Sequence, residues 1–93
     1  MIESFKCKET AKIFDREYSK KFPNNIQRPA FRKLRMLNRA QILQDLRVPP
    51  GNQLELLHGT RKGQHSIRIN KQWRICFIWS RGNVQDVEIV DYH

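Results

Sequence analysis

The residues Pro49-Pro50-Gly51-Asn52 divide this chain into two halves with different hydrophobic periods. Before them apolar residues recur at helical spacing, and after them apolar and polar residues alternate. Two consecutive prolines supply no amide donors and disfavour helix in the residue before them, so the helical half ends here. The pattern predicts an α+β fold in which N-terminal helices pack on a small antiparallel β-sheet. No interdomain linker interrupts the 93 residues, which indicates a single domain over residues 1–93.

Three helices are expected in the first half. The apolar face of the first consists of Cys7, Ala11, Phe14 and Tyr18. This helix ends before residues 22–25, where a proline and two asparagines favour a loop. The second helix has Pro29 in its first turn and a stripe made of Ala30, Leu34 and Leu37. The stripe drifts beyond Asn38, so this residue is expected to cap a third, short helix that runs to about Leu46.

The second half predicts an antiparallel meander. Strands are expected at residues 65–70, 73–79 and 84–92, with a possible fourth, short strand at 54–57 and a weak edge strand at 2–5. Residues 70–72 and 80–83 are short enough to be hairpin turns. One face of the middle strand carries the row Trp73, Ile75, Phe77 and Trp79. We expect this row to face the core, so the two tryptophans are assigned to packing rather than to base stacking.

The positive charge is large and concentrated on the sheet half. The chain has 18 Lys and Arg against 9 Asp and Glu, a net charge of +9. No acidic residue occurs between Glu55 and Asp86. The cations of this segment are Arg61, Lys62, Arg68, Lys71, Arg74 and Arg81. A surface like this attracts polyanions, so RNA, DNA, an acidic protein and anionic lipid are all candidate partners.

Several classes of protein are excluded or disfavoured by the same sequence. Only Cys7 and Cys76 are present, which is too few for a disulfide framework or a zinc site and favours a reducing cytoplasm. The first residues lack the apolar segment of a secretory signal, and the run from Ile75 to Trp79 is too short to cross a bilayer. No phosphate-binding glycine loop, paired carboxylates or nucleophile-elbow serine is found. We therefore expect no membrane association, no metal and no cofactor.

Arg74 is the most informative cation, because it lies inside the most apolar strand and opposite in parity to the aromatic row. A guanidinium there is costly to desolvate unless it meets a partner or faces a cleft. One interpretation is an ion pair with an acidic residue of the next strand, namely Asp86, Glu88 or Asp91. The other is an anion-binding arginine on a concave face of the sheet. Gln72 shares the parity of Arg74.

Two histidines lie near the basic segment. His58 precedes the basic loop, where an accessible imidazole is a candidate for proton transfer, although a lone histidine is usually only a surface residue. His65 falls by alternation on the face of Ile67 and Ile69, so a hydrogen-bonded packing role is expected for it.

Two segments give the chain a specific resemblance to a known family. These are Gly63-Gln64-His65-Ser66-Ile67-Arg68-Ile69-Asn70-Lys71-Gln72-Trp73-Arg74-Ile75-Cys76-Phe77 and the ending Val87-Glu88-Ile89-Val90-Asp91-Tyr92-His93. The chain resembles the HigB family of toxins, and the similarity extends over nearly its whole length. The resemblance implies a RelE-like microbial RNase fold and a toxin that enters the ribosomal A site and cleaves the mRNA there. It also implies a HigA-like helix-turn-helix antitoxin that holds the toxin inactive.

The family's reaction is a metal-independent attack of the ribose 2′-hydroxyl on the adjacent phosphate. By position, the matching catalytic residues are His58, Arg61 or Lys62, Gln72, Arg74 and Tyr92. The surrounding residues expected to bind RNA are Lys62, Arg68, Lys71, Arg81 and His93.

These residue types fit the chemistry, which needs a base, an acid and positive groups around a phosphorane. An arginine fork can bind two phosphate oxygens, an imidazole can transfer a proton near pH 7, and a phenol can donate or orient. Which of His58 and Tyr92 is the acid and which the base stays open, and Gln72 is expected to position the RNA. The alternative is a non-catalytic module that uses the same basic sheet to bind nucleic acid or to dock the antitoxin.

Overall fold

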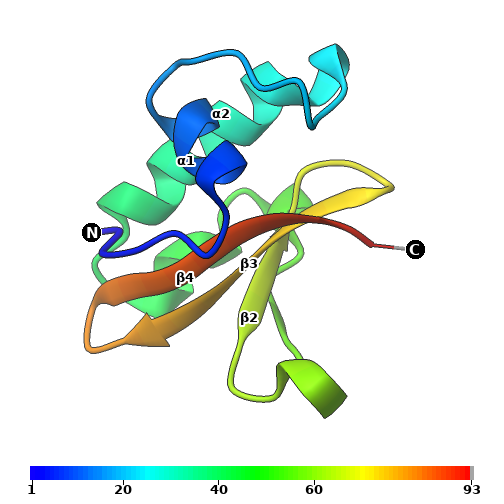
Figure 1. Cartoon of the computed structure of the whole chain (residues 1–93). Helices are drawn as coiled ribbons and strands as arrows, with labels where there is room; N and C mark the ends of the chain where they lie inside the picture. Colours follow the sequence, from blue (N-terminus) through cyan, green and yellow to red (C-terminus); the bar gives the residue numbers. More distant parts are fainter. Residues whose placement is uncertain (93) are drawn as a thin grey trace.

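The computed structural model describes residues 1–92 and shows two α-helices packed on a four-stranded antiparallel sheet. The helices are α1 (Lys8–Phe14) and α2 (Asn24–Arg39), followed by the short 3-10 turns η1 (Leu43–Arg47), η2 (Pro50–Asn52) and η3 (Gly59–Arg61). The strands are β1 (Glu55–Leu56), β2 (His65–Arg68), β3 (Trp73–Ser80) and β4 (Asn83–Asp91), paired in that order. Figure 1 shows α1 and α2 together on one side of the sheet. The predicted α+β fold is confirmed.

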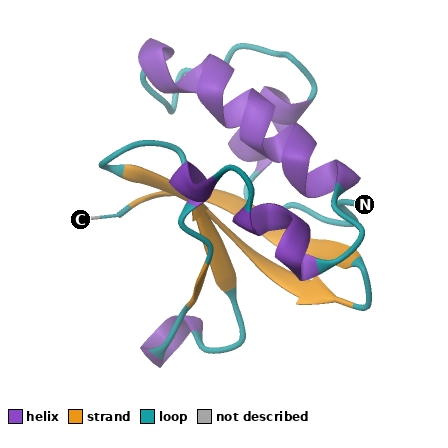
Figure 2. Cartoon of the chain, turned by 180° about the vertical axis from the view of Figure 1, so that it is seen from behind, coloured by secondary structure: helices purple, strands orange, loops and turns teal. Residues whose placement is uncertain are grey.

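The core lies between the helical layer and one face of the sheet. Ile67, Ile75 and Ile89 stand opposite one another in β2, β3 and β4, and each is at most 4% exposed. Residues directly opposite in antiparallel strands project from the same face, so this row meets the helices. The buried face of α2 consists of Ile26, Ala30, Leu34 and Leu37. Figure 2 shows the two layers from behind, with η3 far from α1 and α2.

The aromatic row of β3 faces this core as predicted. Phe77 is fully buried, while Trp73 and Trp79 are partly buried and pack against the same cluster. The ring of Trp73 meets that of Phe22 edge to face, with centroids 5.7 Å apart. Both tryptophans are therefore packing residues.

The first helix is shorter than predicted. It ends at Phe14, because Arg16 adopts a left-handed conformation (φ 64°) that turns the chain away from the helix axis. Tyr18 is consequently outside the helix and 62% exposed, which contradicts its assignment to the apolar face. The buried residues of α1 are Thr10 and Ile13. The hydroxyl of Thr10 accepts a hydrogen bond from the Ile89 amide of β4, which fixes the helix to the sheet.

The second helix is longer than predicted at both ends. It begins at Asn24, so the expected loop at residues 22–25 is partly helical and Pro29 is the sixth residue rather than part of the first turn. Gln27 ties the preceding loop to the helix, since its amide group donates to the Ser19 and Phe22 carbonyls. Asn38 does not cap a third helix, because it lies within α2 and its Oδ1 accepts the Ile2 amide. The 3-10 turn η1 stands in the place of the expected third helix.

The hairpin turns were predicted correctly. The Asn70 side chain accepts the amides of Gln72 and Trp73, which closes the β2–β3 turn. Arg81 and Gly82 both have positive φ (52° and 83°), the geometry of a two-residue turn whose twist matches the flanking strands.

Two features at the edge of the sheet are irregular, namely a bulge in β4 and the pairing of the N-terminal segment with that strand. Asp86 has a φ of 52°, and the pairing register with β3 shifts between Cys76 and Ile78. Because of this extra residue Val84 and Val87 both face the core. The weak edge strand expected at residues 2–5 forms two isolated parallel bridges, Ile2 to Val84 and Phe5 to Val87. Within residues 1–92 no helix is long and apolar enough to span a membrane.

Candidate active site

The face of the sheet opposite the helices carries most of the candidate site. Glu55, Ser66, Cys76 and Glu88 stand opposite one another across the four strands. The adjacent row consists of Arg68, Arg74 and Val90. Both rows are one residue out of phase with the Ile67–Ile75–Ile89 row, so they project away from the core. Arg74 therefore lies on the face predicted for it.

Arg74 is held by a dense set of contacts and is only 6% exposed. Its Nε donates to the Ser66 hydroxyl at 2.8 Å. Its Nη2 donates to the Gln53 carbonyl at 2.6 Å and lies 3.1 Å from the Glu55 carboxylate. A guanidinium with two of its nitrogens fixed in this way has one orientation, which suits it to reading the geometry of an anion.

The ion pair considered for Arg74 exists, but its carboxylate comes from a different strand than expected. Glu55 of β1 forms it, whereas Glu88 of β4 pairs with Arg61. Asp86 is displaced by the bulge and accepts a hydrogen bond from Ser4. Glu55 was not considered from the sequence, because β1 is too short to be aligned with its neighbours.

Tyr92 and Gln72 lie at the same end of the sheet as Arg74. The Cζ of Arg74 is 5.8 Å from the centroid of the Tyr92 ring. Tyr92 is 40% exposed. The Tyr92 amide donates to the Gln72 carbonyl at 2.6 Å, and the Gln72 side chain donates to Asp91 at 3.1 Å. The turn before β3 and the end of β4 thus hold Gln72, Arg74 and Tyr92 together.

Arg61 and Lys62 differ sharply in their surroundings. Nη1 of Arg61 lies 2.7 Å from Glu88 and 3.1 Å from the Gln64 side-chain oxygen. The hydrogen bond to Glu88 raises the pKa of Arg61, although partial burial acts in the opposite direction. Arg61 is therefore folded over the same face as Arg74, while Lys62 is exposed to solvent. The geometry favours Arg61 as the cation of this loop.

Cys76 is a neighbouring group on this face. It lies between Ser66 and Glu88 in the register and is fully buried. Burial raises the pKa of its thiol, so the group is neutral and is a packing residue.

The two histidines have different environments. His58 immediately precedes η3 and is exposed, and among residues 1–92 its imidazole has no hydrogen-bond, ion-pair or ring partner. The structure does not bring it into contact with Arg74 or Tyr92. His65 packs on the Phe77 ring with centroids 6.2 Å apart, as expected. Its buried Nδ1 has no hydrogen-bond partner among the described residues, which contradicts the expected hydrogen bond, and burial lowers its pKa.

The remaining cations divide between the two ends of the sheet. Arg68 shares the row of Arg74, and its Nε donates to the Asn70 carbonyl at 3.0 Å. Lys71 is exposed in the adjoining turn. Arg81 lies in the turn at the other end of β3, seven residues after Arg74. Because a strand rises about 3.3 Å per residue, the two arginines are separated by roughly 23 Å along the strand. Arg81 thus stands apart from this cluster, and His93 lies outside the described residues.

The residues that hold the two arginines were not predicted from the sequence. Glu55, Ser66 and Gln53 fix Arg74, and Glu88 fixes Arg61. The signal that could have found them is the alternation of side chains along a strand. Ser66 precedes the core residue Ile67 and Glu55 follows the apolar Leu54, so both are expected on the face opposite the core. Within residues 1–92 no group of three or more His, Cys, Asp or Glu side chains could hold a metal ion. The polar groups of this face thus include cations, the carboxylates and hydroxyl that hold them, a phenol and a side-chain amide.

Comparisons with known proteins give a consistent result. A family model described as the RelE-like toxin of the type II toxin-antitoxin system HigB matches residues 3–93. Toxin HigB-1 of Vibrio cholerae is 52% identical over 60 residues, which are 64% of this chain and 63% of that protein. An uncharacterized protein of Haemophilus influenzae is 37% identical over 67 residues, 72% of this chain and 66% of that protein. The aligned part of the chain thus covers just under two thirds of each relative.

Proposed function

The chain belongs to the HigB-like toxin family of type II toxin-antitoxin systems, and from this premise we propose that it is an endoribonuclease that cuts mRNA in the ribosomal A site. One observation carries the proposal: the immobilised guanidinium of Arg74 lies beside the exposed ring of Tyr92, on a face that also holds Arg61. Fixed cations next to a proton-bearing group are what phosphodiester cleavage requires.

The reaction in this proposal is an attack of the ribose 2′-hydroxyl on the adjacent phosphorus. The O2′–P bond forms as the P–O5′ bond breaks, which leaves a 2′,3′-cyclic phosphate and a 5′-hydroxyl. The 2′-hydroxyl proton goes to a base, and an acid protonates the departing 5′-oxygen. No metal or other cofactor enters this scheme.

Arg74 and Arg61 act on the charge of the phosphorane. Because Ser66 and the Gln53 carbonyl fix Arg74 before RNA binds, little reorganisation is needed as charge grows on the phosphate oxygens. Arg61 approaches from the loop after His58 and brings a second cation to the same face. Lys62 and Lys71 are exposed and would follow the RNA backbone together with Arg68.

His58 and Tyr92 are the candidate proton-transfer groups, and Gln72 would position the RNA because an amide does not titrate. Tyr92 already contacts Arg74, whereas His58 has to reach the phosphate by movement of its loop or with the RNA in place. Catalytic hydrogen bonds commonly shorten and align only when the substrate is bound.

The proposed partners are mRNA, the ribosome at its mRNA-decoding site and a helix-turn-helix antitoxin. The bacterial cytoplasm is the proposed location, and residues 1–93 are proposed to act as one toxin domain. The net charge of +9 supports an RNA-rich target, since a basic surface binds RNA by releasing counterions.

A second candidate function is non-catalytic binding of nucleic acid by the same face. It is favoured by the absence of any contact between His58 and Arg74 among the described residues, which leaves the arginine without a neighbouring imidazole. A binder of this kind would show salt-dependent affinity and produce no new RNA ends.

Cleavage in a translating extract, mapped by primer extension, separates the two functions. The wild-type protein is expected to produce new mRNA ends in register with the A-site codon. Arg74→Ala should abolish them, while Arg47→Ala, an exposed cation of η1, should not. A wild-type protein that yields no new ends, or an Arg74→Ala variant that is folded by circular dichroism and still cuts, contradicts the proposal.

A further inference from the structure

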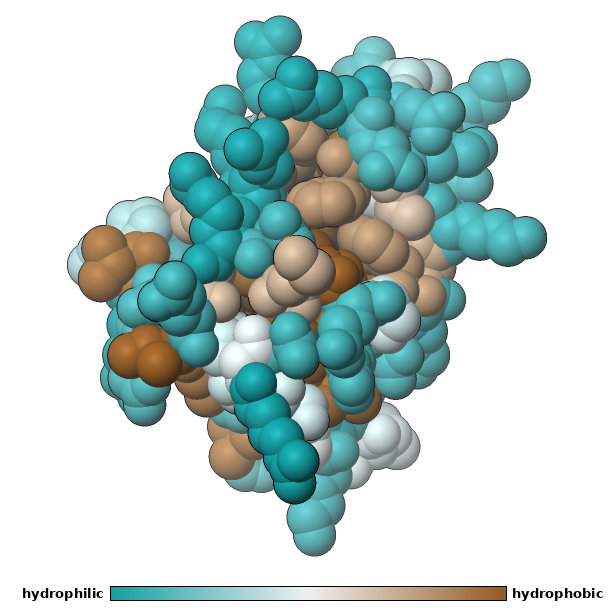
Figure 3. Space-filling model, turned by 90° about the vertical axis from the view of Figure 1, so that its left-hand side faces the viewer, coloured by the Kyte–Doolittle hydropathy of each residue, from teal (hydrophilic) through white to brown (hydrophobic). Residues whose placement is uncertain are grey.

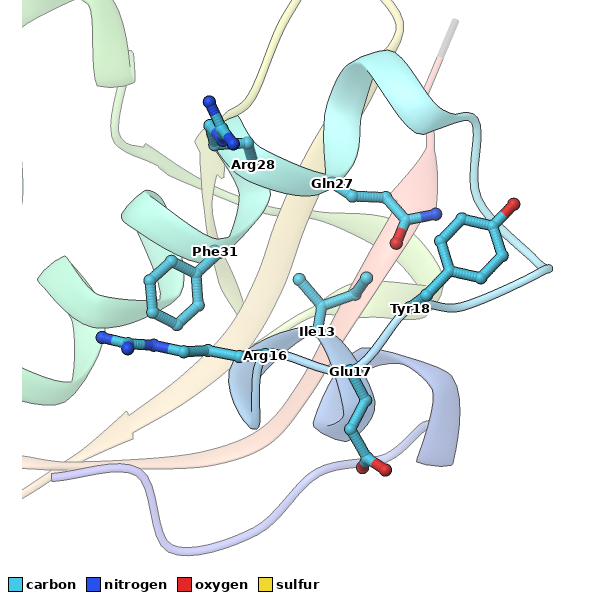
Figure 4. Close-up of a pocket in the computed structure, with 7 residues that line it drawn as sticks. All are labelled: Ile13, Arg16, Glu17, Tyr18, Gln27, Arg28 and Phe31. Carbon is cyan, nitrogen blue, oxygen red and sulfur yellow. The ribbon is translucent and has the colours of Figure 1, made fainter.

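A large pocket lies on the helical side of the structure, away from Arg74 and Tyr92. It has a volume of about 540 Å³ and lies between the end of α1 and the first half of α2. Figure 4 shows Ile13 at its centre, between the Phe31 ring and the Tyr18 ring. The proposed catalytic face makes no use of this pocket, so the pocket calls for its own explanation.

Two smaller pockets extend this one along α2. The second, of about 360 Å³, shares Arg16 and Phe31 with the first. The third, of about 260 Å³, shares Phe31 with both and Arg35 with the second. The surface made up of these three neighbouring pockets, all lined by Phe31, is called the arginine groove below. Its defining residues are Arg16, Tyr18, Arg28, Phe31, Arg35 and Arg39.

The charge of this groove is unbalanced. Five arginines line the three pockets, namely Arg16, Arg28, Arg32, Arg35 and Arg39, against the two carboxylates of Asp15 and Glu17. All five arginines are exposed, and none takes part in an ion pair of the described residues. Four of them recur along α2 at spacings that place them on one helix face, opposite the buried face of that helix. The groove is therefore complementary to a negatively charged partner.

The apolar part of the groove is centred on the Phe31 ring, which two arginine side chains approach. Phe31 has the guanidinium of Arg16 at 5.0 Å and that of Arg35 at 5.8 Å from its ring centroid. Arg16 reaches this position through a left-handed backbone conformation, which is unfavourable for a residue with a β-carbon. Figure 4 shows its side chain running beside the Phe31 ring. Tyrosine and arginine side chains around a half-buried phenylalanine are typical of protein-binding hot spots.

A protein partner fits these observations better than RNA does. Two guanidiniums already lie over the Phe31 ring, which leaves less of it for a stacked base. Figure 3, a view from the left of Figure 1, shows long hydrophilic side chains around a more hydrophobic centre, a mixture typical of protein-binding surfaces.

We propose that the arginine groove docks an acidic, amphipathic segment of the antitoxin. A large apolar side chain of that segment enters the pocket between Phe31 and Tyr18, and its carboxylates pair with Arg28, Arg35 and Arg39. The identity of the partner rests on the proposed function, whereas the location and chemistry of the surface do not. Because the helices and Arg74 lie on opposite faces of the sheet, the docked segment does not contact Arg74.

The test measures binding of the purified antitoxin encoded with this toxin, by isothermal titration calorimetry. The double variant Arg28→Glu/Arg35→Glu should bind at least about tenfold more weakly, because two attractive contacts become repulsive. Phe31→Ala keeps every charge and should also weaken binding by about tenfold, because it removes the apolar anchor. Arg47→Glu makes an exposed charge reversal outside the groove and should bind like the wild type. Thermal unfolding of each variant establishes that it is folded.

Wild-type affinity in the folded double variant would overturn the proposal. It would also be overturned if the variant kept antitoxin binding and instead lost affinity for a labelled oligouridine, since the groove would then be an RNA surface. The mRNA cleavage assay keeps the two proposals separate. If the wild-type protein binds the antitoxin through the groove and yields no new RNA ends, the nuclease proposal fails and the docking surface stands.

Discussion

The guanidinium of Arg74 lies 3.1 Å from the carboxylate of Glu55, and the two residues differ greatly in exposure. The arginine side chain is 8% exposed and the glutamate side chain 50% exposed. The carboxylate therefore reaches a nearly buried cation from the solvent side, where a phosphate would also have to approach. On the proposed function, Glu55 would compete with the RNA for Arg74, and experiment can test this competition.

Replacing Glu55 with Gln should tighten RNA binding. The variant removes one negative charge, while Ser66 and the Gln53 carbonyl still fix the guanidinium. An exposed ion pair contributes up to about 1 kcal/mol, so an affinity gain of about two- to fivefold is expected at low salt. Fluorescence anisotropy with a labelled oligoribonucleotide over a range of salt concentrations measures it. Weaker binding by a Glu55→Gln variant of unchanged thermal stability would contradict the competition.

Replacing Tyr92 with Phe should slow cleavage without affecting the fold. The ring that lies 5.8 Å from Arg74 is kept, and only the phenolic hydroxyl is lost. Loss of a proton-transfer group typically reduces the rate by about 10²- to 10⁴-fold. Quantified primer extension in a translating extract measures the rate. An unchanged rate would leave Tyr92 with a purely structural contact to Arg74.

Arg61 and Lys62 should give different defects when each is replaced with Ala. Arg61 pairs with Glu88 on the face of Arg74, so its loss should reduce the cleavage rate more than RNA affinity. Lys62 is exposed, so its loss should weaken RNA binding and lower the salt-dependence slope by about one. The comparison requires the cleavage rate and the affinity of both variants. The assignment of Arg61 fails if Lys62→Ala has the larger effect on the rate.

Truncating the core should destabilise the protein in proportion to burial. Leu34 of α2 is fully buried, and Leu34→Ala should reduce the free energy of unfolding by about 2–5 kcal/mol. Ile42 is 57% exposed, and Ile42→Ala should change it by less than about 0.5 kcal/mol. Urea denaturation followed by circular dichroism provides both values. Equal effects would show that α2 does not pack as described.

Stability should fall in mildly acidic solution because of His65. Burial lowers its pKa in the folded state, and the unfolded chain takes up the proton first as the pH falls through about 6.5. A group whose pKa is lower in the folded than in the unfolded protein contributes fully to the free energy of unfolding above its unfolded pKa. This contribution decreases as the pH falls below that value. Urea denaturation at pH 7.5 and at pH 5.5 measures the loss. In His65→Phe, which keeps a ring against Phe77, this part of the pH dependence should disappear.

The element types and the turns of this fold were predictable because each depends on nearby residues. Asn70 and Gly82 supply turn geometry within a few positions, and alternation in β2 and β3 reflects the two faces of a strand. Helix ends were predicted less well. Asn38 looks like a cap in sequence, yet it lies within α2 and bonds to Ile2, a partner 36 positions away.

The candidate site shows the same division. Arg74, Gln72 and Tyr92 could be selected from parity and from the family resemblance, and the structure brings these three together. Glu55 could not be selected, because β1 contains two residues and carries almost no periodic signal. The bulge at Asp86 could not be foreseen either, and it is what places Val84 and Val87 on one face.

By itself, the sequence determined the order of helices and strands, the face of β3 on which Arg74 projects, and the surplus of positive charge. These follow from local backbone preferences and from the period of the side chains. The tertiary structure alone decided which carboxylate holds each arginine and that Arg16, from outside α2, lies against the Phe31 ring. Contacts of this kind join residues from different elements, and their geometry depends on how the packed layers align.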